Sequence, residues 1–157
     1  MFIYAVRAST IRFVLMVMLS LGLLLGLVVY TTGEVVAAVN DKGVKYTYSG
    51  IRTNDDRVRF LEQFGWQTGG ELVEEETFTI PDTFDRVLLG YNEIQKAQGL
   101  DLSRYEKKKV TRYTYEITNY EGYEGTVYAN LIVYRDKVIA ADLCSADPMG
   151  FVRGIEK

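Results

Sequence analysis

One carboxyl group of this chain lies where burial could give it acid–base chemistry. Asp142 stands between Ala141 and Leu143 in an otherwise apolar segment. Burial raises the pKa of a carboxyl group, so that it can act as a general acid. A hydrolase of this kind needs a second carboxylate at a set distance, and no acidic residue has a spacing that places it beside Asp142. We therefore expect a structural carboxylate, satisfied by a hydroxyl, by an arginine such as Arg112, or by backbone donors.

Other catalytic chemistries lack their residue types. The chain contains no histidine, which removes histidine-based triads, the usual zinc sites and the commonest general base. Cys144 is the only cysteine, so no internal disulfide can form, and no histidine is present to activate its thiol. The sequence therefore predicts a domain that is not an enzyme and that uses no cofactor and no metal.

Charged runs suggest surfaces rather than sites. Four glutamates lie between positions 71 and 76 without the alternating pattern of a calcium loop, which favours a solvated sheet edge. The lysines at 107–109 could bind an anionic polymer, but lysines also protect sheet edges from unwanted pairing. Beyond position 33 the chain has 21 acidic and 16 basic residues, a net charge of −5. This charge argues against nucleic acid as a partner.

The chain is rich in tyrosine, with twelve in all. Aromatic side chains on adjacent strands can form a binding platform, but they are also common core residues of sheets. Both interpretations stay open. The candidate ligand or partner face consists of Tyr113, Tyr115, Tyr128, Tyr134 and Asp142.

The N-terminal part carries a long apolar segment. Residues 13–33 contain no charged side chain and are long enough for a helix that crosses a bilayer. Arg7 and Arg12 precede the segment, which predicts a cytoplasmic N-terminus. A signal peptide cleaved after Ala38 is the alternative, although the apolar core of such peptides is usually shorter, about 7–15 residues. We expect a single-pass signal anchor in the cell membrane, with the C-terminal domain outside the cytoplasm.

The domain organisation follows from this segment. We expect a cytoplasmic tip and anchor at residues 1–33, a stalk at 34–53 and one folded domain at 54–157, since the remaining length suffices for one core.

The longest expected helix begins after Pro81 and ends at Gly99. Asp82 is the expected N-cap, and Gly99 the C-terminal stop. Its expected buried stripe consists of Phe84, Val87, Leu88, Tyr91, Ile94 and Ala97, and its expected outward residues are Asp85, Arg86, Asn92, Glu93 and Lys96. We also expect the side chains of Tyr91, Asn92 and Gln95 to bond the loop after Gly99.

The remaining elements give an α+β fold. A short helix is expected at 53–65, strands at 77–80, 107–119, 126–134 and 138–144, and an irregular tail at 145–157. Strands linked by short hairpins form an antiparallel sheet. We expect both helices to pack on one face of this sheet.

The order of several motifs resembles a known family. These are Gly65-Trp66, Ile80-Pro81, the run Tyr-Asn-Glu-Ile-Gln-Lys-Ala-Gln-Gly-Leu-Asp-Leu at 91–102, Arg-Tyr-Thr-Tyr-Glu at 112–116, Asn119-Tyr120 and Val138-Ile139 before Asp142. Over residues 54–151 the chain resembles an uncharacterised family of small, N-terminally membrane-anchored proteins from spore-forming Gram-positive bacteria. The resemblance implies export and brings no catalytic residue.

Taken together, the sequence favours a membrane-anchored, extracytoplasmic domain that binds or regulates a protein or cell-envelope partner without catalysis. Two alternatives stay open. One is a carboxylate-dependent hydrolase of the cell envelope that uses Asp142, and the other is a structural accessory subunit of a membrane complex.

Overall fold

The computed structural model describes residues 45–157. The expected membrane span at 13–33 and most of the expected stalk lie outside the described residues. Within residues 45–157, no helix is both long and apolar enough to cross a membrane.

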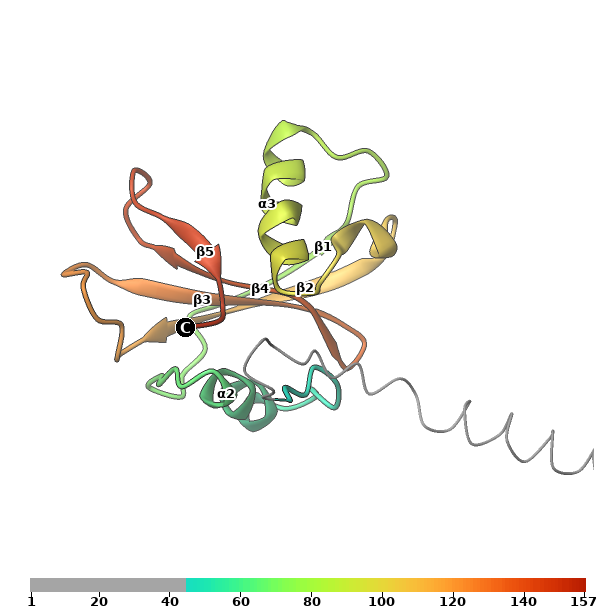
Figure 1. Cartoon of the computed structure of the whole chain (residues 1–157). Helices are drawn as coiled ribbons and strands as arrows, with labels where there is room; N and C mark the ends of the chain where they lie inside the picture. Colours follow the sequence, from blue (N-terminus) through green and yellow to red (C-terminus); the bar gives the residue numbers. More distant parts are fainter. Residues whose placement is uncertain (1–44) are drawn as a thin grey trace, which may run out of the picture. The chain divides into compact units, whose positions relative to one another are not determined.

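The described chain folds into an α+β domain with a five-stranded antiparallel sheet (Figure 1). This confirms the expected fold class. The elements in chain order are α2 (Asn54–Gln63), β1 (Glu74–Thr79), α3 (Arg86–Ala97), the 3-10 helix η1 (Leu102–Tyr105), β2 (Lys109–Ile117), β3 (Val127–Tyr134), β4 (Lys137–Ser145) and β5 (Val152–Gly154). The strands lie side by side in the order of the sequence, so that β1 and β5 form the two edges.

The two helices cover opposite faces of the sheet, so the prediction of a single covered face is wrong (Figure 1). Side chains alternate between the faces along each strand. In β3, Leu131 belongs to the core beneath α2, and its neighbour Ile132 belongs to the core beneath α3. Because β3 and β4 carry apolar residues on both faces, each face needs its own cover. We call these the α2 face and the α3 face.

Helix α2 agrees with its prediction. Thr53 and Asp56 form a capping box at its start, in which each side chain accepts a hydrogen bond from the backbone N–H of the other residue. Phe60 and Leu61 are fully buried against the sheet. Residues 45–53, part of the expected stalk, also pack here: Tyr48 is buried, and its carbonyl accepts from the Val138 N–H.

Helix α3 differs from its prediction in both start and buried face. Asp85, not Asp82, is the N-cap, and its carboxylate accepts from the Leu88 N–H at 2.8 Å. Val87, expected in the core, is 80% exposed, and Asn92, expected to face solvent, is buried. Asn92 bonds the following loop as expected, because its side-chain oxygen accepts from the Leu102 N–H.

Gln95 of α3 and Gln98, the C-cap residue of this helix, complete the hydrogen bonding of β4. In the β4–β5 register Asp142 pairs with Gly154, so the next pair would join Ala141 and Ile155. Instead, the Gln98 amide lies between them: its Nε2 donates to the Ala141 carbonyl, and its Oε1 accepts from the Ile155 N–H. Gln95 Oε1 accepts from the Ala141 N–H at 2.9 Å. The buried side of α3 is therefore polar, because it replaces backbone partners of a strand.

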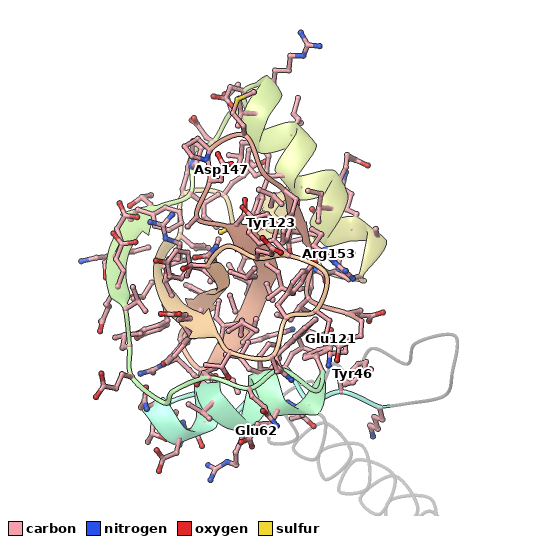
Figure 2. The ribbon with its side chains drawn as sticks, turned by 90° about the vertical axis from the view of Figure 1, so that its left-hand side faces the viewer. Tyr46, Glu62, Glu121, Tyr123, Asp147 and Arg153 are labelled. Carbon is pink, nitrogen blue, oxygen red and sulfur yellow. The ribbon has the colours of Figure 1, made fainter. Side chains whose placement is uncertain are left out.

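The segment expected as an irregular tail contains β5 and a part of the core. Ile155, directly after β5, is fully buried. Its carbonyl accepts from the Trp66 indole N–H at 2.6 Å, and the Trp66 ring stacks on Tyr120. Figure 2 views this side of the molecule, with Arg153 of β5 labelled.

Candidate functional site

A groove of about 440 Å³ opens on the α3 face. The first half of α3 forms one wall with Val87 and Leu88, Val152 of β5 contributes to the lining, and Asn130 and Asp142 lie on the sheet beneath. Val87 is 80% exposed and Val152 is 51% exposed. The groove thus combines an apolar rim with a polar floor.

The floor follows from the register of three strands. Thr114, Asn130 and Asp142 lie directly opposite one another on β2, β3 and β4. The Thr114 hydroxyl donates to Asn130 Oδ1 at 2.8 Å, and Asn130 Nδ2 donates to Asp142 Oδ2 at 2.9 Å. From above, the Tyr91 hydroxyl donates to Asp142 Oδ1 at 2.6 Å. Hydrogen bonds therefore link α3 to the floor of the groove through Asp142.

Burial governs the acid–base properties of this pair. Asp142 is 3% exposed. Loss of hydration raises the pKa of Asp142, while the hydrogen bonds from Tyr91 and Asn130 act in the opposite direction. Burial, together with the nearby Asp142 carboxylate, raises the pKa of Tyr91 well above its ordinary value. Tyr91 therefore stays a neutral hydrogen-bond donor.

Arg112 lies between the groove and a second depression of about 500 Å³. Its Nη2 contacts the carboxylates of Glu74 at 3.1 Å and Glu76 at 2.8 Å on β1. Its Nε is buried and has no hydrogen-bond partner among the described residues. Val73 and Tyr128 also line the second depression.

Cys144 is half-buried at the junction of the two depressions. Asn130 Nδ2 lies 3.3 Å from its sulfur. Burial raises the pKa of the Cys144 thiol, so the unreactive protonated form is favoured at neutral pH.

The five residues predicted as one ligand face lie on both faces of the sheet. Tyr113 and Tyr115 belong to the α2 face. Tyr128 and Asp142 lie on the α3 face at the two depressions, whereas Tyr134 packs against Tyr105 of η1 at a ring distance of 5.6 Å. The prediction of a single face is therefore wrong, because the register sets odd positions of β2 and even positions of β3 on opposite sides.

The two tyrosines on the α2 face instead hold a buried arginine. Arg57 Nε donates to the Tyr115 hydroxyl at 2.7 Å, and that hydroxyl donates to Asn54 Oδ1 at 2.8 Å. The Arg57 guanidinium lies 3.9 Å from the centre of the Tyr113 ring. These contacts fix α2 to the sheet. Tyr113 and Tyr115 are therefore core residues of the sheet and not part of a binding platform.

Other charged candidates show no site geometry. The described residues 45–157 contain no group of three or more cysteine, aspartate or glutamate side chains that could hold a metal ion. Glu74 and Glu76 lie on the exposed edge strand β1, as the interpretation of a solvated edge requires. The lysines at 107–109 precede or begin β2, which is an inner strand, so they protect no sheet edge.

Several groove residues were not predicted as site residues from the sequence. Tyr91 was expected in the core of the helix stripe, and Val87 was expected to be buried. Asn130 carries a usable sequence signal, because it is an amide in the middle of the otherwise apolar strand expected at 126–134. Val152 lies in the expected irregular tail, for which the sequence predicts no strand. Their convergence depends on the register and on the angle of α3, which local patterns do not encode.

The fold and the groove define a small α+β domain with a candidate ligand site on its α3 face. Residues 60–143 match the family described as Domain of unknown function (DUF4830). The chain belongs to this family. None of the curated proteins and none of the solved structures matches the chain.

The matched range includes α3 and Asp142 but ends before β5. Membership of an uncharacterised family is thereby confirmed. The bacterial source and the membrane anchor stay predictions.

Proposed function

We propose that the domain is a non-catalytic binding module and that the groove on the α3 face contacts its ligand. The observation that carries this proposal is the exposure of Val87 and Val152 in a groove that also has a polar floor. Concave sites with apolar walls and a few fixed polar groups are typical of binding sites. Exposed apolar side chains around such a site gain free energy when a ligand removes them from water.

The contacts of Asp142 favour binding over hydrolysis. Its two oxygens accept from the neutral side chains of Tyr91 and Asn130. Asp85, the other carboxylate that lines the groove, is occupied in capping α3. A carboxylate-dependent hydrolase of envelope sugars needs two carboxylates that are free to exchange protons or attack the substrate, so a groove that recognises its ligand by contact is the better account.

We also propose that residues 13–33 anchor the domain in the cell membrane and that the domain lies outside the cytoplasm. The support is the length of this uncharged segment and the arginines before it. A ligand of the groove would then be a protein or a component of the cell envelope.

Capture from crosslinked membranes tests the groove as the contact surface. The full chain, Val87→Arg and Leu89→Arg would be compared, because both residues are exposed on α3 but only Val87 lines the groove. We expect Val87→Arg to abolish capture of the ligand and Leu89→Arg to preserve it.

Equal capture by all three proteins would contradict a contact through the groove. If the captured protein is a stoichiometric membrane complex bound through another surface, the accessory-subunit alternative becomes the better account.

A further inference from the structure

We propose that the groove on the α3 face receives a lysine side chain of a protein partner and that Asp142 accepts hydrogen bonds from its ammonium group. This inference rests on the proposed binding function and names the chemistry of the ligand. It depends on three features of the groove: the hydrogen-bond donors of its floor are engaged, its buried carboxylate makes no ion pair, and its lining includes apolar side chains.

The hydrogen bonds of the floor all run toward Asp142. The Thr114 hydroxyl donates to Asn130 Oδ1, and Asn130 Nδ2 donates both to Asp142 Oδ2 and to the Cys144 sulfur. The Tyr91 hydroxyl donates to Asp142 Oδ1. An ionised carboxylate has about four acceptor sites, and Tyr91 and Asn130 occupy two of them. The floor therefore has acceptors left but no strong donor, so it fits a ligand that donates hydrogen bonds.

The charges of the groove also favour a cation. Of the described residues that line it, Asp85 and Asp142 are acidic and only Arg112 is basic. Arg112 Nη2 already contacts the carboxylates of Glu74 and Glu76. The Asp85 carboxylate caps α3 and offsets the positive end of its helix dipole. Asp142 makes no ion pair within the described chain, so it is the charge that a ligand cation would balance.

The apolar lining fits the stem of a lysine side chain. Phe78, Leu88 and Ile132 line the groove together with its polar residues. A lysine side chain can bury its methylene groups against such a surface while its compact ammonium group presents three donors. Val87 and Val152 are 80% and 51% exposed, and residues next to the lysine in a protein partner would cover them. A free amine has no such residues, so a protein partner is the better fit.

Binding of small amino-acid derivatives to the full chain in detergent micelles, followed by NMR, tests this inference. The probes are Nα-acetyl-lysine methylamide, its uncharged Nε-acetylated form, and Nα-acetyl-glutamate methylamide. We expect the lysine derivative to bind at least about tenfold more tightly than either of the other two. We also expect it to shift the side-chain amide resonance of Asn130, which donates to Asp142. The side-chain amide of Asn92, which donates to Asp101 outside the groove lining, is the control and should not shift.

Two conservative variants separate contact with Asp142 from general attraction of charge. Asp142→Asn removes the carboxylate on the floor. Asp85→Asn removes the other carboxylate of the lining, and asparagine is an equally good N-cap. At about pH 8, where we expect Asp142→Asn to be least destabilising, this variant should lose binding of the lysine derivative. Asp85→Asn should weaken binding by no more than about fivefold. If Asp142→Asn does not fold, the Asn130 resonance of the unsubstituted chain decides alone.

Three results would overturn the inference. They are equal binding of the lysine derivative and its Nε-acetylated form, tighter binding of the glutamate derivative, and binding of the lysine derivative without a shift at Asn130. A further probe, n-butylamine, tests the source of the ammonium group. If n-butylamine binds as tightly as the lysine derivative, the groove takes a free amine and the assignment to a protein partner is wrong.

Failure of this inference is distinguishable from failure of the proposed function. If Val87→Arg abolishes capture of a ligand while the lysine derivative does not bind, the groove is a binding site for another class of ligand. If the lysine derivative binds while Val87→Arg captures normally, the captured partner binds through another surface and the proposed function fails.

Discussion

The carboxyl group of Asp142 is buried on the sheet, where the neutral side chains of Tyr91 and Asn130 donate hydrogen bonds to it. Its apolar flanks in the sequence predicted burial, and the structure confirms it, with 3% of the residue exposed. The expected hydroxyl partner is the Tyr91 side chain. The sequence could not identify this tyrosine, because Tyr91 and Asp142 meet only when α3 crosses the sheet.

The raised pKa of Asp142 predicts a pH-dependent effect of Asp142→Asn on stability. The folded state binds this proton more tightly than the unfolded chain does. The stabilisation is therefore fully present below the ordinary carboxyl pKa and is lost as pH rises through the raised pKa of Asp142. Asparagine has no such proton. We expect the destabilisation by Asp142→Asn to be largest near about pH 4 and to shrink toward about pH 8.

Urea denaturation of both proteins across this pH range measures the difference in unfolding free energy. Groups common to both proteins cancel in this difference. A penalty that grows with rising pH would mean that Asp142 is stabilised as a carboxylate and that its pKa is lowered on folding.

Gln95 and Gln98 show that the helix α3 could be predicted while its buried face could not. The apolar spacing predicted the α3 helix, but the helix hides glutamine amides as partners of Ala141 and Ile155. The spacing of apolar residues shows only which helix face is apolar. It cannot show that a buried polar side chain hydrogen-bonds the backbone of a strand. The sequence predicts only the end of edge strand β1, at 77–80. It does not predict edge strand β5, because three residues are too few to show an alternation of apolar and polar side chains.

Substitution of Gln98 tests this element directly. Gln98→Leu leaves the Ala141 carbonyl and the Ile155 N–H without their partner. We expect the unfolding free energy to fall by about 1–3 kcal/mol, the cost of unsatisfied buried polar groups. We also expect faster hydrogen exchange at Ile155. Lys96→Leu, on the exposed side of the same helix, is the control and should leave exchange at Ile155 unchanged.

At the scale of the whole molecule, the C-terminal segment closes the core on the α2 face. Ile155 is fully buried and accepts the Trp66 N–H. We expect removal of residues 155–157 to lower the unfolding free energy by about 2–5 kcal/mol, as loss of a large buried side chain does. Trp66 is the only tryptophan, so its fluorescence emission should shift to longer wavelength. Glu156→Gln, which retains Ile155, should keep the native emission, and an unshifted truncated protein would exclude this role.

The α+β class and most strands could be predicted because hairpin-linked strands have local signals. That helices cover both faces of the sheet could not be predicted, because the sequence shows which residues are apolar but not which helix packs on which face. The membrane anchor is a further whole-molecule prediction, based on residues 13–33.

Protease treatment of intact protoplasts tests this anchor. We expect the domain to be digested while the N-terminal segment stays with the membrane, because the arginines before the span favour a cytoplasmic N-terminus. A mature form that begins at Val39 and is released into the medium would show that a signal peptide had been cleaved instead.

The central claim is that the groove on the α3 face contacts the ligand, and crosslinking in living cells tests it most directly. A photoreactive amino acid would replace Val87 in the groove, or Glu62, which is exposed on α2. The account predicts a discrete crosslinked product from position 87, none from position 62, and loss of the product when Val152→Arg is added. A product from position 62 alone would place the contact on the α2 side and contradict the account.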